Sequence, residues 1–137
     1  MSRYHPKIII VDDNDIMRTL LRGILRNEQY QVVGEARNGI QALELAESLK
    51  PDLICLDVMM PELDGLEVLR TLKRDYPAIG VVMITGNASM ENVQEALELG
   101  ANGIVVKPFN AAKVLEALSR AWANHQSNSP APPPPNA

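Results

Sequence analysis

The chain has little of what several classes of protein depend on. Its 137 residues include one cysteine, so no disulfide can form within the chain. No apolar run approaches the roughly 20 residues that cross a bilayer. The apolar segment 8–11 is interrupted by Asp12 and Asp13, which leaves it too short for the core of a signal peptide. We therefore expect a cytoplasmic protein that does not insert into membranes.

An excess of positive charge is also lacking. The formal net charge is -4, and Lys and Arg do not cluster along the chain. Nucleic acid is therefore not an expected partner, because phosphate backbones are bound by clustered basic side chains. Hydrophobic residues at 46% and charged residues at 22% are typical of one globular domain with its own core. Cys55 lies inside an apolar run and is expected to be a small core residue.

What the chain does contain is a regular alternation of short apolar runs and amphipathic segments. Five strands are predicted at 8–11, 30–36, 53–56, 80–85 and 103–106. A helical pattern follows each run after a short connection, which favours a parallel sheet with right-handed crossovers and helices on both faces. The expected fold is therefore α/β: a five-stranded, doubly wound parallel sheet with five helices. The second run has the weaker pattern of an edge strand, which favours the flavodoxin-like order 2-1-3-4-5.

Polar residues mark where the helices are expected to begin. The predicted N-caps are Asn14, Asn38, Asp64, Ser89 and Asn110. The buried stripe of the first helix is predicted to consist of Met17, Leu20, Leu21 and Ile24. Its arginines, among them Arg18 and Arg22, fall on other faces and are expected to be solvated.

The composition changes abruptly at Gln126, where Ser, Asn, Ala and Pro take over. Nothing there is apolar enough to pack, so we expect a domain of residues 1–125 followed by a disordered, proline-rich tail of residues 126–137. Pro130 and Pro133 have the P-x-x-P spacing, but a solvated tail or the stub of a linker is the expected state.

The polar residues of most chemical interest follow the predicted strands. They are Asp12 and Asp13 after the first, Asp57 after the third, Thr85 after the fourth and Lys107 after the fifth. The carboxyl ends of parallel strands form one edge of a sheet, so these side chains should converge. Three carboxylates together would repel one another without a cation, and oxygen ligands suit Mg²⁺. A carboxylate nucleophile, a divalent ion, a lysine and a hydroxyl are what phosphoryl transfer to an aspartate requires.

Each of these residues has a plainer explanation when it is taken alone. Asp57 could be an ordinary loop acid, although its place directly after a buried strand favours a function. Asp12 and Asp13 could favour the following helix through its dipole, an effect of about 0.3 to 1 kcal/mol. Thr85 could be an ordinary strand-end residue, and Lys107 could be a surface lysine.

Taken together, the motifs resemble the receiver domain of response regulators in bacterial two-component signalling, of the stand-alone type found among chemotaxis regulators. The matching motifs are Asp12-Asp13, the segment from Asp57 to Gly65, Thr85-Gly86 and Lys107-Pro108-Phe109. They agree in order and spacing, and the resemblance covers residues 7 to about 124.

The resemblance implies a role for each site residue. Asp57 would accept a phosphoryl group, and Asp12, Asp13 and Asp57 would hold Mg²⁺ together with the backbone carbonyl of Met59. Thr85 would move toward the phosphoryl group and Lys107 would pair with it. The bond between Lys107 and Pro108 would be cis.

The implied function is a phosphorylation-controlled switch. A sensor histidine kinase or a histidine phosphotransfer protein would supply the phosphoryl group, and the phosphorylated protein would bind an unknown downstream protein. The chain would be a monomer or a weak, phosphorylation-dependent dimer. It would be no enzyme beyond its own Mg²⁺-dependent phosphorylation and dephosphorylation.

Three alternatives remain at this point. The protein could be a phosphorelay intermediate that passes the group from Asp57 to a second histidine protein. It could be a phosphatase that forms an aspartyl-phosphate, although Met59 stands where such haloacid-dehalogenase-like enzymes carry a second aspartate. An FMN carrier of the same fold is a third alternative, but the fold alone does not support it, and the acidic edge would repel a phosphate in the absence of a metal ion.

One position departs from the family pattern. The family commonly carries Tyr or Phe three residues before the lysine, where this chain has Ile104. An aliphatic side chain cannot serve as that aromatic switch, so we expect the signal to travel through the loop 85–90 and the helix after it.

Overall fold

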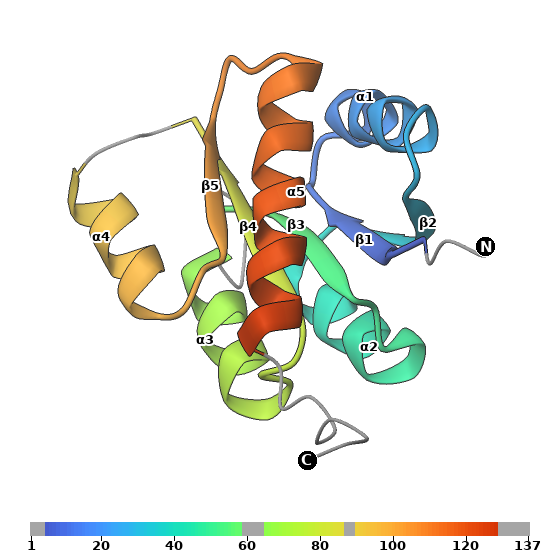
Figure 1. Ribbon diagram of the computed structural model, residues 1–137. Helices are drawn as coiled ribbons and strands as arrows, with labels where there is room; N and C mark the ends of the chain where they lie inside the picture. The colour runs from blue at the N-terminus through green and yellow to red at the C-terminus, as the bar shows by residue number, and fades with distance from the viewer. Residues whose placement is uncertain (1–4, 59–64, 87–89, 129–137) are drawn as a thin grey trace, which may run out of the picture.

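The computed structural model describes residues 5–58, 65–86 and 90–128, which alternate between strands and helices along the chain (Figure 1). The strands are β1 (Lys7–Val11), β2 (Gln31–Ala36), β3 (Leu53–Asp57), β4 (Gly80–Thr85) and β5 (Gly103–Val106). The helices are α1 (Asp15–Arg26), α2 (Gly39–Leu49), α3 (Gly65–Asp75), α4 (Met90–Glu98) and α5 (Ala111–Asn128). None of the helices in these ranges has the length and apolar character needed to cross a membrane.

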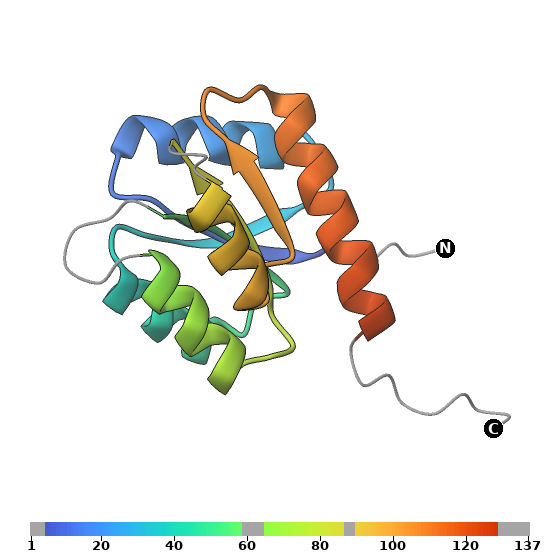
Figure 2. The same cartoon turned by 90° about the vertical axis from the view of Figure 1, so that its left-hand side faces the viewer.

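All strand pairings are parallel, and the sheet order is β2-β1-β3-β4-β5. The predicted flavodoxin-like order is therefore confirmed, with β2 at an edge and β3 at the centre. Helices α1 and α5 cover one face of the sheet, while α2, α3 and α4 cover the other (Figures 1 and 2).

The alternation of side chains along each strand divides the core into two layers. In β1, Ile8 and Ile10 face α1 and α5, whereas Ile9 and Val11 face the other three helices. A strand covered on both faces has no solvated side, which is why β1, β3 and β4 are continuous apolar runs. Cys55 of β3 is buried in the first layer, as predicted, and burial raises the pKa of its thiol to about 12.

Side-chain caps hold the beginnings of three helices. The side-chain oxygens of Asn14, Asn38 and Asn110 accept backbone N–H groups three residues further on, each at 2.9 Å. All three predicted caps are confirmed, because each side chain satisfies a donor that the helix itself leaves unpaired. The predicted caps Asp64 and Ser89 lie outside the described residues.

Helix α1 corrects one part of the predicted stripe. Leu21 and Leu25 are fully buried, whereas Leu20 is 49% exposed. The apolar face of this helix is wider than the strip that the sheet covers. The helix is oriented so that Leu21 and Leu25, which are four residues apart, enter the core. Leu20 and Ile16 are left on the outer edge.

Helix α5 corrects the predicted boundary at residue 125. The helix continues to Asn128, so residues 126–128 belong to it rather than to a disordered tail. Gln, Ser and Asn do not break a helix, and the first strong obstacle is Pro130, which disfavours helical backbone in the residue before it. Residues 129–137, the rest of the predicted tail, lie outside the described residues.

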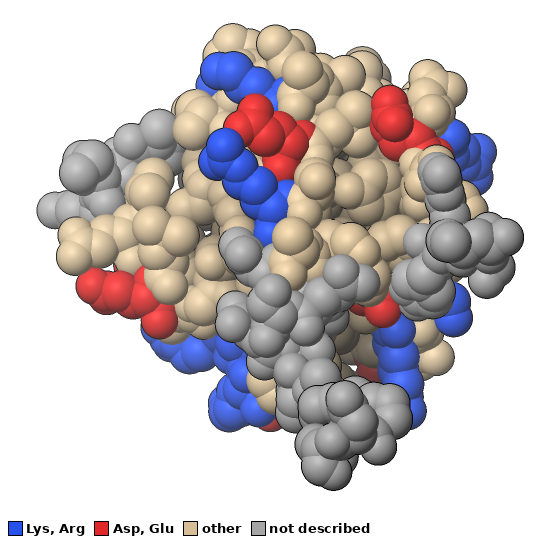
Figure 3. All heavy atoms as spheres, in the orientation of Figure 1, with Lys and Arg blue, Asp and Glu red and all other residues tan. Residues whose placement is uncertain are grey.

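Charged side chains are interspersed on the face formed by α5 and its neighbours. Lys and Arg lie beside Asp and Glu in small groups in Figure 3. One such pair joins Arg120 and Glu116 of α5, with 2.7 Å between nitrogen and oxygen. The described side chains of this face therefore form no extended field of one sign.

Two glycines provide a matched test of how closely α3 approaches the sheet. A Cβ on Gly65 would lie 2.5 Å from the backbone oxygen of Asp57, whereas a Cβ on Gly23 in α1 would meet nothing within 4 Å. We expect Gly65→Ala to lower the free energy of unfolding by about 1 to 3 kcal/mol, because backbone must shift to admit the methyl group. Gly23→Ala should raise it by up to about 1 kcal/mol, through higher helix propensity. Urea unfolding followed by circular dichroism measures both, and equal effects would contradict the packing described.

A second pair tests the orientation of α1. We expect Leu21→Ala to cost about 2 to 5 kcal/mol of unfolding free energy, because it leaves a cavity in the core. Leu20→Ala should change the same quantity by less than about 1 kcal/mol, since the side chain is half exposed. The reverse ranking in the same urea experiment would favour the stripe predicted from sequence.

Candidate functional site

The predicted site residues meet at the carboxyl ends of four adjacent strands. Asp12 follows β1, Asp57 ends β3, Thr85 ends β4 and Lys107 follows β5. The parallel register aligns these ends, with Asp57 opposite Ile84 and Thr85 opposite Val106. The sheet itself thus brings together residues that are far apart in the sequence.

Three carboxylates form the centre of this site. Asp12, Asp13 and Asp57 each offer an oxygen, and these oxygens lie within 4.8 Å of one another. Asp12 and Asp57 are buried, with 1% and 3% of their surface exposed, while Asp13 is exposed. The cluster therefore has two buried acids and one that faces solvent, and its three oxygens could hold a metal ion.

The carboxylate of Asp12 is only half satisfied. Its Oδ1 accepts the backbone N–H of Asn14 at 2.8 Å, but its Oδ2 is buried and has no hydrogen-bond partner among the described residues. A buried acceptor without a partner costs about 1 to 3 kcal/mol, and more when it is charged. A cation beside Oδ2 would remove that cost, so the residues present fit a metal ion.

Lys107 contributes the positive charge nearest to the acids. Its Nζ lies 3.7 Å from Oδ1 of Asp57 and 3.8 Å from Oδ2 of Asp12. These distances are those of ion pairs rather than direct hydrogen bonds, so the amine attracts both carboxylates without satisfying either. Its backbone N–H donates to the carbonyl of Thr85 at 2.7 Å, which ties the lysine to the end of β4. The bond between Lys107 and Pro108 is cis, as the family resemblance implied.

Thr85 is buried at the edge of the same site, with 3% of its surface exposed. Its place between β3 and β5 puts it in the row of strand ends that carries Asp57 and Lys107. Its movement toward a phosphoryl group stays a prediction. The backbone carbonyl of Met59 and the segment 87–89 lie outside the described residues.

Arg18 lies next to the site, although the helical pattern predicted that it would be on a solvated face of α1. Only 12% of its side chain is exposed, and its Nη1 donates to the backbone carbonyl of Asp12 at 2.7 Å. Its Nε lies 3.5 Å from Oε1 of Glu35, and its Nη2 pairs with Asp15. Arg37 and Arg18 together hold the pKa of Asp15 below its usual range. The arginine therefore anchors the loop that carries Asp12.

The sequence contains a signal for only one of the contacts of Arg18, the pair with Asp15. Arg18 lies three residues after Asp15, which is the spacing of neighbours on a helix surface. The contacts with the Asp12 carbonyl and with Glu35 on β2 depend on how α1 packs, which no local pattern encodes.

Ile104, the residue that departs from the family pattern, lies on β5 opposite Met83 of β4. It is half-buried and packs against the layer beneath α3 and α4. Its side chain therefore fills space beside the sheet edge without the ring that the family commonly has there.

Comparison with known proteins gives the same family. The model of the response regulator receiver domain matches residues 8–119. The chemotaxis protein CheY of Listeria monocytogenes is 41% identical over 115 residues, which cover 84% of this chain and 97% of that protein. The CheY of Bacillus subtilis is 38% identical over 114 residues, covering 83% of this chain and 95% of that protein.

Solved structures resemble the chain over most of its length. A CheY-like receiver domain from Methanospirillum hungatei superimposes with a TM-score of 0.85 at 27% identity, covering 92% of this chain and 100% of that one. CheY of Borrelia burgdorferi, in a complex with CheX, BeF3 and Mg²⁺, has a TM-score of 0.78 at 28% identity, covering 82% of this chain and 85% of the matched chain.

The acidic cluster at the strand ends, the sheet order and these matches agree along nearly the whole domain. The chain belongs to the response-regulator receiver domain family, as a CheY-like member of a group whose proteins are signalling switches rather than classical enzymes.

Proposed function

We propose that this protein is a switch controlled by phosphorylation of Asp57, with a histidine kinase as the source of the phosphoryl group. The observation that carries the proposal is the grouping of three carboxylates within 4.8 Å around one lysine, whose Nζ lies 3.7 Å from Asp57. A protein that recognises the phosphorylated form would carry the signal onward.

Asp57 is the best placed nucleophile of the three acids. It ends a strand that is buried along its whole length, so its carboxylate is held rigidly over an apolar floor. One of its oxygens would attack phosphorus as the bond to the histidine nitrogen breaks, with the electron pair leaving on that nitrogen. Asp12 suits a supporting role, because the hydrogen bonds to its Oδ1 and its carbonyl fix the loop between β1 and α1.

Asp12, Asp13 and Asp57 would hold Mg²⁺, with the backbone carbonyl of Met59 as a further ligand. The ion supplies charge neutralisation at the phosphoryl oxygens when it is bound. Hard oxygen donors favour Mg²⁺, and the CheY relative in complex with Mg²⁺ supports the same choice.

Lys107 and Thr85 would respond to the new charge. Phosphorylation adds about -1.5 to -2 charges to a site that already contains three carboxylates. Lys107 would pair with a phosphoryl oxygen, and Thr85 would donate its hydroxyl to another. Because Ile104 lacks an aromatic ring, we place transmission to the partner in the loop 85–90 and α4 rather than in a ring movement on β5.

The chemistry of the site indicates the class of each partner protein. A sensor histidine kinase or a histidine phosphotransfer protein fits the donor, and a downstream protein fits the receiver of the signal. No observation on this chain favours the phosphorelay alternative over the switch. A monomer, or a dimer that forms weakly on phosphorylation, is the proposed state.

Phosphorylation of the purified chain tests the assignment. With a small phosphodonor and Mg²⁺, we expect the wild type to gain the mass of one phosphoryl group and Asp57→Asn to gain none. Asp75→Asn is the matched control, because this acid of α3 is exposed and its one ion pair among the described residues is with its neighbour Arg74. Intact-mass spectrometry gives the result, and a gain in Asp57→Asn would overturn the choice of Asp57.

Metal binding has a separate readout in stability. Mg²⁺ at ten times its dissociation constant should raise the free energy of unfolding by about 1.4 kcal/mol, because it binds the folded state alone. Asp13→Asn should weaken this effect without unfolding the protein, since Asp13 is exposed. Thermal unfolding with and without Mg²⁺ measures the difference, and Asp75→Asn should behave as wild type. An unchanged Mg²⁺ response in Asp13→Asn would remove that residue from the metal site.

A further inference from the structure

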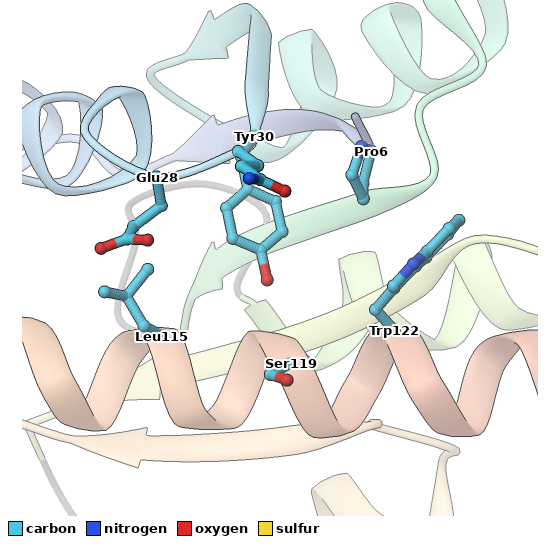
Figure 4. A pocket seen from close by; sticks show the side chains of 7 residues that line it. Pro6, Glu28, Tyr30, Leu115, Ser119 and Trp122 are labelled. Atoms are coloured by element: carbon cyan, nitrogen blue, oxygen red, sulfur yellow. The ribbon is translucent and has the colours of Figure 1, made fainter. Parts of the chain in front are cut away.

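A pocket of about 330 Å³ lies at the opposite end of the sheet from the carboxylates. It opens between α5 and the segments that lead into β1 and β2. Its lining includes Pro6, Glu28, Tyr30, Leu115, Ser119 and Trp122 (Figure 4). We call these six residues the aromatic slot. Its volume is at the lower end of the range of about 300 to 1,000 Å³ that is usual for ligand sites.

Two aromatic side chains stand at either side of this slot. Figure 4 shows the phenol oxygen of Tyr30 directed toward α5, and the indole of Trp122 extending away from α5 on the side of the pocket where Pro6 lies. Both rings are half-buried and pack against the layer under α1 and α5. Burial, followed by the charges of Cys55 and Glu28, raises the pKa of Tyr30, so its hydroxyl remains a hydrogen-bond donor at neutral pH.

This combination suits a segment rich in proline. Proline has no backbone N–H, so a run of prolines offers only carbonyl acceptors. The slot supplies hydroxyl donors from Tyr30 and Ser119 beside flat apolar surfaces. Aromatic-lined grooves recognise polyproline II segments in this way, and the preformed helix loses little entropy on binding.

The chain carries such a segment immediately after α5. Residues 129–137 contain five prolines, four of them consecutive at 132–135, and no charged side chain. We propose that this segment turns back along α5 and docks its proline run in the aromatic slot of the same chain.

The lengths of the two parts agree with this arrangement. Trp122 precedes the end of α5 by six residues, which is about 9 Å along the helix axis. The four prolines at 132–135 span about 12 Å as polyproline II. A reversal within residues 129–131 therefore lets this run extend back along α5 as far as Trp122 and Ser119.

Because the segment is tethered to the domain, even a weak affinity is enough for it to occupy the slot. A short linker gives an effective concentration of about 1 mM, so a segment that binds with a millimolar dissociation constant would occupy its own slot about half the time. The docked tail would cover the beginnings of β1 and β2 and leave the carboxylates at the other end open to a kinase. A proline-rich segment of another protein would have to displace it.

Trp122 is the only tryptophan of the chain and reports on the slot directly. We expect replacement of all four prolines at 132–135 by serine in the full chain to shift the indole N–H signal in ¹H–¹⁵N spectra and to increase quenching of the emission by acrylamide. A peptide of residues 129–137 added to this variant should restore both signals, with a midpoint of about 1 mM. The replaced residues lie beyond α5, and circular dichroism verifies that the domain remains folded.

A double substitution separates docking from direct effects on the indole. In a Tyr30→Leu background, the four serine replacements should no longer change the Trp122 signals, because the slot has lost one aromatic wall. Tyr76→Leu is the matched control, since Tyr76 packs on the opposite face of the sheet and should leave the response intact. Equal Trp122 signals with the proline and serine tails would overturn the proposal. A difference that grows with protein concentration would also overturn it, by assigning the slot to the tail of a second copy.

Discussion

Repulsion among three carboxylates at one edge of the sheet is the constraint around which the site is arranged. β1 and β3 are hydrogen-bonded neighbours, so the acids that follow them cannot move apart without disrupting the sheet. Lys107 offsets part of the repulsion through two ion pairs of 3.7 and 3.8 Å. One buried oxygen of Asp12 is still left without a hydrogen bond among the described residues, which makes the cluster receptive to a cation.

The surroundings of the site supply the rigidity that this arrangement needs. Apolar layers on both faces fix β1 and β3, and α3 begins so close to the end of β3 that only glycine fits at position 65. Arg18 holds the carbonyl of Asp12, and the backbone N–H of Lys107 holds the carbonyl of Thr85. The charged groups are thus positioned by backbone contacts before any ligand arrives, which is what an electrostatic site requires.

The two ends of the sheet differ in how their polar groups are satisfied. Near the start of β4, Lys73 donates to the carbonyl of Ile79 at 3.0 Å and to Asn102 at 2.7 Å, and Asn102 also accepts from Val81 at 2.9 Å. Desolvation lowers the pKa of this half-buried lysine, but its hydrogen bonds compensate for the burial. Satisfied polar groups hold this end together, whereas at the carboxyl ends of the strands one buried oxygen of Asp12 has no hydrogen-bond partner in the described part of the chain. Helix α5 begins near Lys107 and carries the aromatic slot on its later turns, so it spans both regions.

The sequence by itself determined the elements, their order and the residues at the strand ends. Apolar runs, asparagine caps and short connections are local signals, and a parallel sheet converts strand ends into one shared edge whatever the details of packing. The family motifs point to Asp12, Asp13, Asp57, Thr85 and Lys107 as the candidate site residues. The cis bond at Pro108 followed from the same resemblance.

Only the tertiary structure decided which face of each helix or strand packs in the core and which segment it contacts. Leu25 rather than Leu20 enters the core, because the apolar face of α1 is wider than the part that the sheet can cover. Arg18 is half-buried and contacts the carbonyl of Asp12 and the carboxylate of Glu35, and Tyr30 faces Trp122 across a pocket. These contacts join segments that are distant in the chain. Periodicity specifies that a face is apolar or charged, but the partner of that face depends on how whole elements pack.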